Sequence, residues 1–126
     1  MRVAVDIDGT LDANPREMQS MMSALLAAGH IVSVVTGTSD GSVTQADWDN
    51  KAAYLASLGC AECWSDLTVV AHGVGDANDL AVQKADWLVT NGVDVYFDNT
   101  VANIKAANKA GIKLCLLPWG SRIKDS

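Results

Sequence analysis

Short apolar runs alternate with amphipathic stretches along the chain. Five of the runs are rich in Val, Ile and Leu, are short enough for strands, and are bounded by Gly, Pro or polar residues. Continuous apolar runs of this length are typical of parallel strands that are buried on both faces of a sheet. The predicted strands are residues 2–7, 31–35, 67–71, 93–97 and 112–117.

The segments between the predicted strands carry helix signals. Asn14 and Pro15 suit the N-cap and the first position of a helix, and Glu17 suits a capping box. Apolar residues then recur at helical spacing until Gly29, which favours a helix end. The same pattern predicts helices at about residues 48–58, 78–90 and 101–110.

Strands that alternate with helices imply parallel pairing with right-handed crossovers. We therefore predict an α/β fold, a three-layer sandwich around a five-stranded parallel sheet. No repeat, low-complexity stretch or linker divides the 126 residues, so the prediction is one domain over residues 1–126.

Composition and charge narrow the classes of protein. The chain is 49% hydrophobic and 19% charged, which is typical of a globular protein. No apolar run approaches the roughly 20 residues of a membrane helix, and the N-terminus lacks the apolar region of a signal peptide, so we expect a cytoplasmic protein without a membrane partner. The net charge of −6 and the lack of a basic stripe disfavour a nucleic-acid backbone as the main partner.

The cysteines have three possible roles. An odd number of cysteines, Cys60, Cys63 and Cys115, argues against a disulfide framework. Cys60 and Cys63 have the spacing of half a zinc site, but only Cys115 and His72 could complete it. Packing or a surface turn is the favoured interpretation, and metal binding by this pair stays open.

Polar side chains follow several predicted strands at the point where ligands bind to open parallel sheets. Asp6 and Asp8 end the first strand, Thr36 the second, and Asp98 and Asn99 the fourth. Clustered carboxylates repel one another unless a cation lies among them, and oxygen ligands favour Mg²⁺. The sequence therefore predicts a magnesium and phosphate site at this edge.

The same residues resemble the motifs of the haloacid dehalogenase superfamily. The first motif is similar to residues 6–11, Asp-Ile-Asp-Gly-Thr-Leu, and the second to Val-Val-Thr-Gly at residues 34–37. Lys84 resembles the lysine of the third motif, and Tyr-Phe-Asp-Asn-Thr at residues 96–100 the acidic fourth motif. The resemblance spans residues 1 to about 117 and implies a Rossmann-like hydrolase domain.

The resemblance also implies roles for these residues in phosphate-monoester hydrolysis. Asp6 would attack phosphorus and form an aspartyl-phosphate, while Asp8 would protonate the leaving oxygen and then activate water. Thr36, Gly37 and Lys84 would bind the phosphoryl group. Mg²⁺ would be held by the side chains of Asp6 and Asp98 and by the main-chain carbonyl of Asp8.

Two departures from the family bear on the substrate. Asn99 stands where an Asp-Asp pair is commoner, which lowers the local negative charge and puts the metal affinity in doubt. The segments 9–14 and 71–78 leave no room for a cap domain. The site should thus be open, unless a second subunit covers it, and the phosphorylated substrate could be small, a protein segment or a polynucleotide end.

Other interpretations of the same residues stay open. The domain could be a weak or inactive module that binds phosphate or metal, or a receiver-like phosphoacceptor domain. Lys51 is the substitute if Lys84 lies on a solvated face. The glycines of residues 73–76 favour a turn over a phosphate-binding loop, and the polar loop 38–45 is a candidate for substrate contact.

Overall fold

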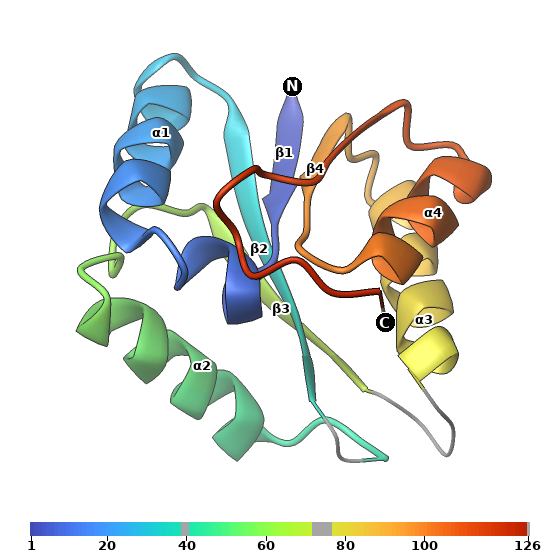
Figure 1. Ribbon diagram of the computed structural model, residues 1–126. Helices are drawn as coiled ribbons and strands as arrows, with labels where there is room; N and C mark the ends of the chain where they lie inside the picture. Colours follow the sequence, from blue (N-terminus) through green and yellow to red (C-terminus); the bar gives the residue numbers. More distant parts are fainter. Residues whose placement is uncertain (39–40, 72–76, 126) are drawn as a thin grey trace.

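The structure of the protein, a computed structural model, describes residues 1–38, 41–71 and 77–125. Strands and helices alternate along these residues (Figure 1). The strands are β1 Arg2–Val5, β2 Ile31–Thr38, β3 Asp66–Ala71, β4 Val95–Phe97 and β5 Leu114–Leu116. The helices are α1 Pro15–Ala27, α2 Gln45–Ser57, α3 Ala77–Thr90 and α4 Val101–Ala110, with a short π-helical turn, η1 Ile7–Leu11, after β1.

All five strands pair in parallel, in the order β3-β2-β1-β4-β5. The predicted five-stranded parallel α/β sheet is therefore confirmed. Val5, near the end of β1, pairs with Val34 of β2 on one side and with Phe97 of β4 on the other. This register places the carboxyl ends of β1 and β4 beside each other, where the predicted acidic residues follow.

Two apolar clusters cover the two faces of the sheet, because successive side chains of a strand point to opposite faces. Val3 and Val5 pack into the cluster under α1 and α2, whereas Ala4 lies in the cluster that includes Leu88 of α3 and Ala107 of α4. Figure 1 shows α1 and α2 on one side of the sheet and α3 and α4 on the other. This arrangement is the three-layer sandwich that the alternation predicted.

Some element boundaries differ from the prediction. β4 and β5 are three residues each, since Val93 and Ile112 are buried in the core ahead of the paired segments. β2 extends to Thr38 because it stays paired with β3 as far as Ala71. No helix of the described residues is long and apolar enough to cross a membrane.

The predicted capping box of α1 is not formed. Asn14 is the N-cap, but its side chain makes no cap hydrogen bond and instead donates to the carbonyl of Gly120 at 3.0 Å. The capping box lies at α2, where the Thr44 side chain accepts from the Asp47 amide and the Asp47 side chain accepts from the Thr44 amide. A partner from the C-terminal segment thus replaces the local one at Asn14.

The odd number of cysteines argued against a disulfide framework and favoured packing or a surface turn for Cys60 and Cys63, but the two residues form a disulfide. A disulfide joins Cys60 and Cys63 in the turn before β3, with their Cα atoms 5.2 Å apart, a normal separation for a bridge. Both side chains are buried in the cluster under α1 and α2, which supports a packing role over a surface turn. Cys115 packs into the cluster on the opposite face, and His72 lies outside the described residues.

Arg2 ties together the amino-terminal ends of three strands. Its guanidinium donates to Ser33 Oγ of β2 at 2.9 Å and to Asp66 Oδ2 of β3 at 3.0 Å. It also donates to the carbonyl of Asn91 at 3.1 Å and lies over the ring of Trp87, 5.3 Å from its centroid. One side chain thus links β1, β2, β3 and the end of α3.

Replacing this guanidinium should lower stability. In Arg2→Met the apolar stem remains, but the buried Ser33 hydroxyl loses its donor, which costs about 1–3 kcal/mol. Urea unfolding measures the change, with the exposed Arg16→Met as the matched control. Equal unfolding free energies for the two variants would show that the Arg2 network contributes nothing.

Candidate active site

The carboxyl ends of β1 and β4 bring two carboxylates and one ammonium group together. Asp6 follows β1 and its amide donates to the carbonyl of Phe97 at 3.0 Å, while the Asp98 amide donates to Leu116 at 3.1 Å. Lys84 Nζ lies 2.8 Å from Asp6 Oδ1 and 3.4 Å from Asp98 Oδ2. All three side chains are buried, so the predicted trio Asp6, Lys84 and Asp98 forms one cluster.

Lys84 reaches this cluster from the inner face of α3. Leu80 and Leu88 lie one turn to either side of Lys84, and Leu88 is fully buried. A lysine on such a face needs a charged partner, because an unpaired buried ammonium is costly. Lys84, and not Lys51, is therefore the lysine that contacts Asp6; Lys51 instead lies 3.4 Å from Asp8 Oδ2.

Asp98 is held by further donors that the sequence did not single out. Its Oδ2 accepts hydrogen bonds from the Tyr96 hydroxyl and from Asn103 Nδ2, the latter at 3.0 Å, and its Oδ1 accepts from the Thr100 amide at 2.8 Å. Their positions in the sequence could have indicated this, because Tyr96 lies two residues before Asp98 and Asn103 lies within the first turn of α4. Asp98 is thus fixed from several sides.

Burial dominates the electrostatics of the cluster. It raises the pKa of Asp6 to about 7; Lys84 opposes this rise, and the negative charge of Asp98 adds to it. Burial lowers the pKa of Lys84, but Asp6 and Asp98 more than offset it and leave that pKa raised. Burial, followed by Asp98, also raises the pKa of Tyr96 well above its usual value. Lys84 therefore stays charged at neutral pH and Tyr96 stays a neutral donor.

The other predicted site residues lie in different surroundings. The Asp8 side chain is 59% exposed and pairs with Lys51 instead of joining Asp6. Thr36 is fully buried near the end of β2, and its Oγ1 has no hydrogen-bond partner among the described residues. A Cβ at Gly37 would lie 2.8 Å from the terminal methyl groups of Leu80, so a larger residue there would force the Leu80 side chain to shift.

A tight turn links Asp6 to the rest of its motif. Gly9 has a φ of +80°, and a Cβ there would collide with the Asn99 amide, so only glycine fits. Thr10 Oγ1 lies 3.3 Å from Asp6 Oδ2 and 3.3 Å from Asn99 Oδ1, and its single proton can go to either. Thr10 and Asn99 thus connect the loops after β1 and β4.

The cluster fits a hard divalent cation. Two buried carboxylates and one ammonium leave a net negative charge, and Asp6 Oδ2 has Thr10 as its hydrogen-bond donor, at 3.3 Å. No three His, Cys, Asp or Glu side chains of the described residues are placed to hold a metal together. A cation here would therefore use Asp6, Asp98 and oxygens of the main chain or water, as Mg²⁺ commonly does.

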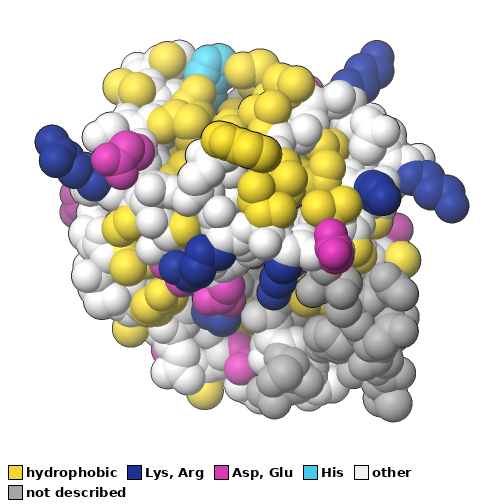
Figure 2. All heavy atoms as spheres, in the orientation of Figure 1, with side chains coloured by type: hydrophobic (Ala, Val, Ile, Leu, Met, Phe, Trp, Pro, Cys, Tyr) yellow, Lys and Arg dark blue, Asp and Glu magenta, His cyan; other side chains and the backbone are white. Residues whose placement is uncertain are grey.

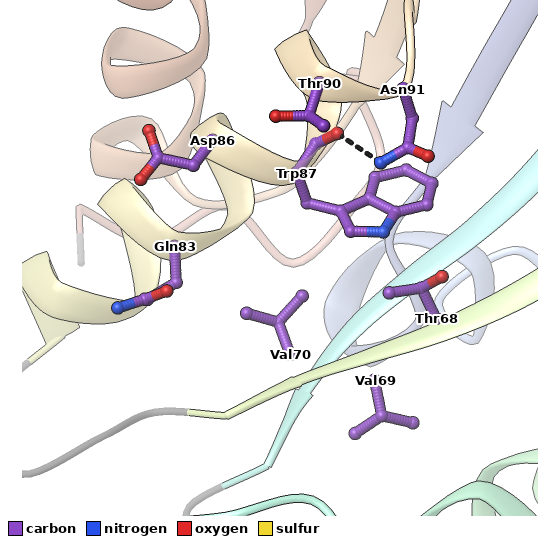
Figure 3. Close-up of a pocket in the computed structure, with 8 residues that line it drawn as sticks. All are labelled: Thr68, Val69, Val70, Gln83, Asp86, Trp87, Thr90 and Asn91. Atoms are coloured by element: carbon purple, nitrogen blue, oxygen red, sulfur yellow. Dashed lines mark hydrogen bonds between the residues drawn. The ribbon is translucent and has the colours of Figure 1, made fainter.

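A separate cavity of about 340 Å³ lies between β3 and α3 (Figure 3). Val70 and the indole of Trp87 form its apolar wall, and Asn91 donates to the carbonyl of Trp87 at 2.8 Å at one end. None of the predicted site residues lines it.

The predicted loop at residues 73–76 and part of the loop 38–45 lie outside the described residues.

The fold and cluster define the class of protein as a parallel α/β protein with a buried carboxylate–lysine site at the carboxyl edge of its sheet. Comparison with models of known protein families finds no match. Comparison with curated proteins likewise finds no match.

The raised pKa of Asp6 predicts a pH-dependent stability. Between its ordinary pKa of 3.8 and about 7, the unfolded chain has lost a proton that folded Asp6 keeps. The contribution of Asp6 to stability therefore falls as pH rises through this window, by at most about 1.4 kcal/mol per unit. Urea unfolding with a chelator should show wild type losing stability relative to Asp6→Asn from pH 5 to pH 7. If the unfolding free energies of the two proteins changed in parallel with pH, the prediction would be contradicted.

The buried Thr36 hydroxyl predicts an unusual substitution. Thr36→Val keeps the shape and removes a hydroxyl that has no described partner, so stability should rise by about 1 kcal/mol. Thermal unfolding of the unliganded protein measures the change, and Thr68→Val, on the neighbouring β3, is the control. A loss of stability in Thr36→Val would reveal a partner for the hydroxyl.

Proposed function

We propose that the protein is a capless, magnesium-dependent phosphohydrolase, similar to haloacid dehalogenase phosphatases, that cleaves phosphate monoesters through an aspartyl-phosphate on Asp6. The observation that carries the proposal is the contact of Lys84 with both Asp6 and Asp98, at 2.8 and 3.4 Å. These three residues come from separate motifs, and their order along the chain is the order that the resemblance requires.

Asp6 is the proposed nucleophile because its oxygens differ. Oδ1 is held by the Lys84 ammonium, which orients the carboxylate, whereas Oδ2 has Thr10 as its donor at a longer distance. Attack by Oδ2 on phosphorus forms the aspartyl-phosphate and breaks the bond to the leaving oxygen. Lys84, already charged, stabilises the negative charge that moves onto the phosphoryl oxygens.

Thr36 supplies the second contact to the phosphoryl group. Its hydroxyl is buried without a described partner, at the end of the strand beside β1. A buried hydroxyl without a partner lowers the stability of the unliganded protein, and it gains a hydrogen bond when an acceptor binds. Phosphate oxygens are such acceptors.

Asp8 is the proposed acid and base. Its carboxyl is exposed and paired with Lys51, so it must leave that pair to reach the leaving group. The leaving oxygen takes a proton from Asp8, and Asp8 later takes one from the water that hydrolyses the aspartyl-phosphate. The protons therefore balance over one turnover.

Mg²⁺ would be held by Asp6, Asp98 and the main-chain carbonyl of Asp8. When bound, it would screen the charge of the anionic substrate from that of the carboxylates. Asp98 is suited to a fixed ligand because Tyr96, Asn103 and the main chain already orient it.

Asn99 and Asp98 favour one alternative, a module that binds phosphate or metal without turnover. Asp98 Oδ2 already accepts three hydrogen bonds, and Asn99 carries no charge to assist a metal.

A receiver-like domain is disfavoured by the strand order, β3-β2-β1-β4-β5, since receiver domains have the order 2-1-3-4-5.

Hydrolysis of p-nitrophenyl phosphate with Mg²⁺ tests the proposal. Asp6→Asn should lower kcat more than about a thousandfold, because the amide cannot form the acyl-phosphate. Asp86→Asn, an exposed position on α3, is the matched control and should match wild type. Full activity in Asp6→Asn would refute the mechanism, and phosphate binding by an inactive wild type would favour the binding module.

A further inference from the structure

The C-terminal segment is bonded to both loops that carry the acidic residues. Residues 120–125, which we call the strap, come shortly after β5 and run back across the molecule past η1 to α4 (Figure 1). The Arg122 amide donates to the carbonyl of Gly9 at 2.9 Å, and the Arg122 carbonyl accepts from Asn99 Nδ2 at 2.5 Å. Gly9 belongs to the loop after Asp6, and Asn99 follows Asp98.

The strap also completes the N-terminus of α4. Thr100, the N-cap, makes no side-chain cap hydrogen bond. The amides of Val101 and Ala102 instead donate to the carbonyls of Lys124 and Asp125, at 2.8 and 2.9 Å. Because the first amides of a helix need partners from outside it, the start of α4 depends on the strap.

The Arg122 side chain extends these contacts to a third segment. Its guanidinium pairs with Asp12 Oδ1 at 2.5 Å, although the arginine side chain itself is 63% exposed. The same Asp12 oxygen accepts from the Gly9 amide at 2.7 Å, and Asp12 Oδ2 accepts from the Tyr54 hydroxyl of α2 at 2.6 Å. Asp12 thus joins η1, α2 and the strap, and Arg122 neutralises its charge. On the face of the molecule that Figure 2 shows, basic and acidic side chains lie next to one another.

We propose that the strap is part of the active site, and that Asn99 and Arg122 are positioning residues that hold the Asp6–Gly9 loop against the loop that follows β4. The expected effect on catalysis rests on the proposed function, whereas the expected effect on how the loop is held does not. It also explains why an amide stands at position 99. A carboxylate there would face the Arg122 carbonyl without a proton to donate, whereas Asn99 Nδ2 donates to it.

Two substitutions each remove a different contact of the strap. Asn99→Asp keeps the side-chain shape but replaces a donor by an acceptor against the Arg122 carbonyl. Arg122→Ala leaves the main-chain contacts and removes only the ion pair with Asp12, and Arg122→Lys restores the charge. Lys113→Ala, a substitution of an exposed lysine outside the strap, is the control.

Amide hydrogen exchange at Gly9, measured by NMR in metal-free protein, is the first readout. The Gly9 amide is bonded to Asp12, so both Asn99→Asp and Arg122→Ala should speed its exchange about tenfold, with partial recovery in Arg122→Lys. The amide of Val34 in the sheet should be unaffected. Unchanged exchange at Gly9 in both variants would overturn the proposal, whatever the protein catalyses.

Hydrolysis of p-nitrophenyl phosphate with Mg²⁺ is the second readout. Misplacing the loop should lower kcat about tenfold in Asn99→Asp and Arg122→Ala, with KM changed less than about twofold, since the groups that bind phosphate are untouched. Lys113→Ala should match wild type. Faster exchange at Gly9 with unchanged kcat would reduce the strap to a structural role and overturn its part in catalysis. An active Asp6→Asn refutes the proposed function while the exchange result at Gly9 stands.

Discussion

The position of Lys84 between Asp6 and Asp98 is the interaction on which the rest of the site depends. An ammonium with 3% residue exposure needs charged partners, and two buried carboxylates need a cation. Removing one member of such a group costs about 3–5 kcal/mol when a charge is left unpaired. The pairing therefore fixes how α3 lies on the sheet, where Leu80 packs closely against Gly37.

Hydrophobic patterning predicted the architecture well because the sheet is buried on both faces. The runs that became β1, β2 and β3 have no other way to bury their apolar side chains, and the glycines after α1 and α2 end those helices with positive φ, at Gly29 and Gly59. The pattern could not set where pairing begins. Val93 and Ile112 are as apolar as strand residues, but they pack into the core without joining the ladder.

Sequence reasoning about the site succeeded where position along a strand decides the outcome. Asp6 and Asp98 follow neighbouring parallel strands, so their proximity follows from strand order alone, and Lys84 was predictable from the apolar residues one turn away. It failed where long-range contacts decide. The bond of Asn14 to Gly120, the hub at Asp12 and the return of the C-terminal segment to Gly9 join residues about a hundred positions apart, and no local pattern marks them.

The surroundings of the two buried carboxylates are unequal, and this inequality bears on their roles. Asp98 accepts hydrogen bonds from Lys84, Tyr96, Asn103 and the Thr100 amide, so its charge is dispersed and its position is fixed. Asp6 accepts from Lys84 and, at a longer distance, from Thr10, and burial leaves its pKa near neutrality, at about 7. A carboxylate with few donors keeps more of its nucleophilicity than one with many. The same cluster therefore contains one carboxylate with few donors and one held by many, and this difference matches the roles proposed for Asp6 as nucleophile and Asp98 as metal ligand.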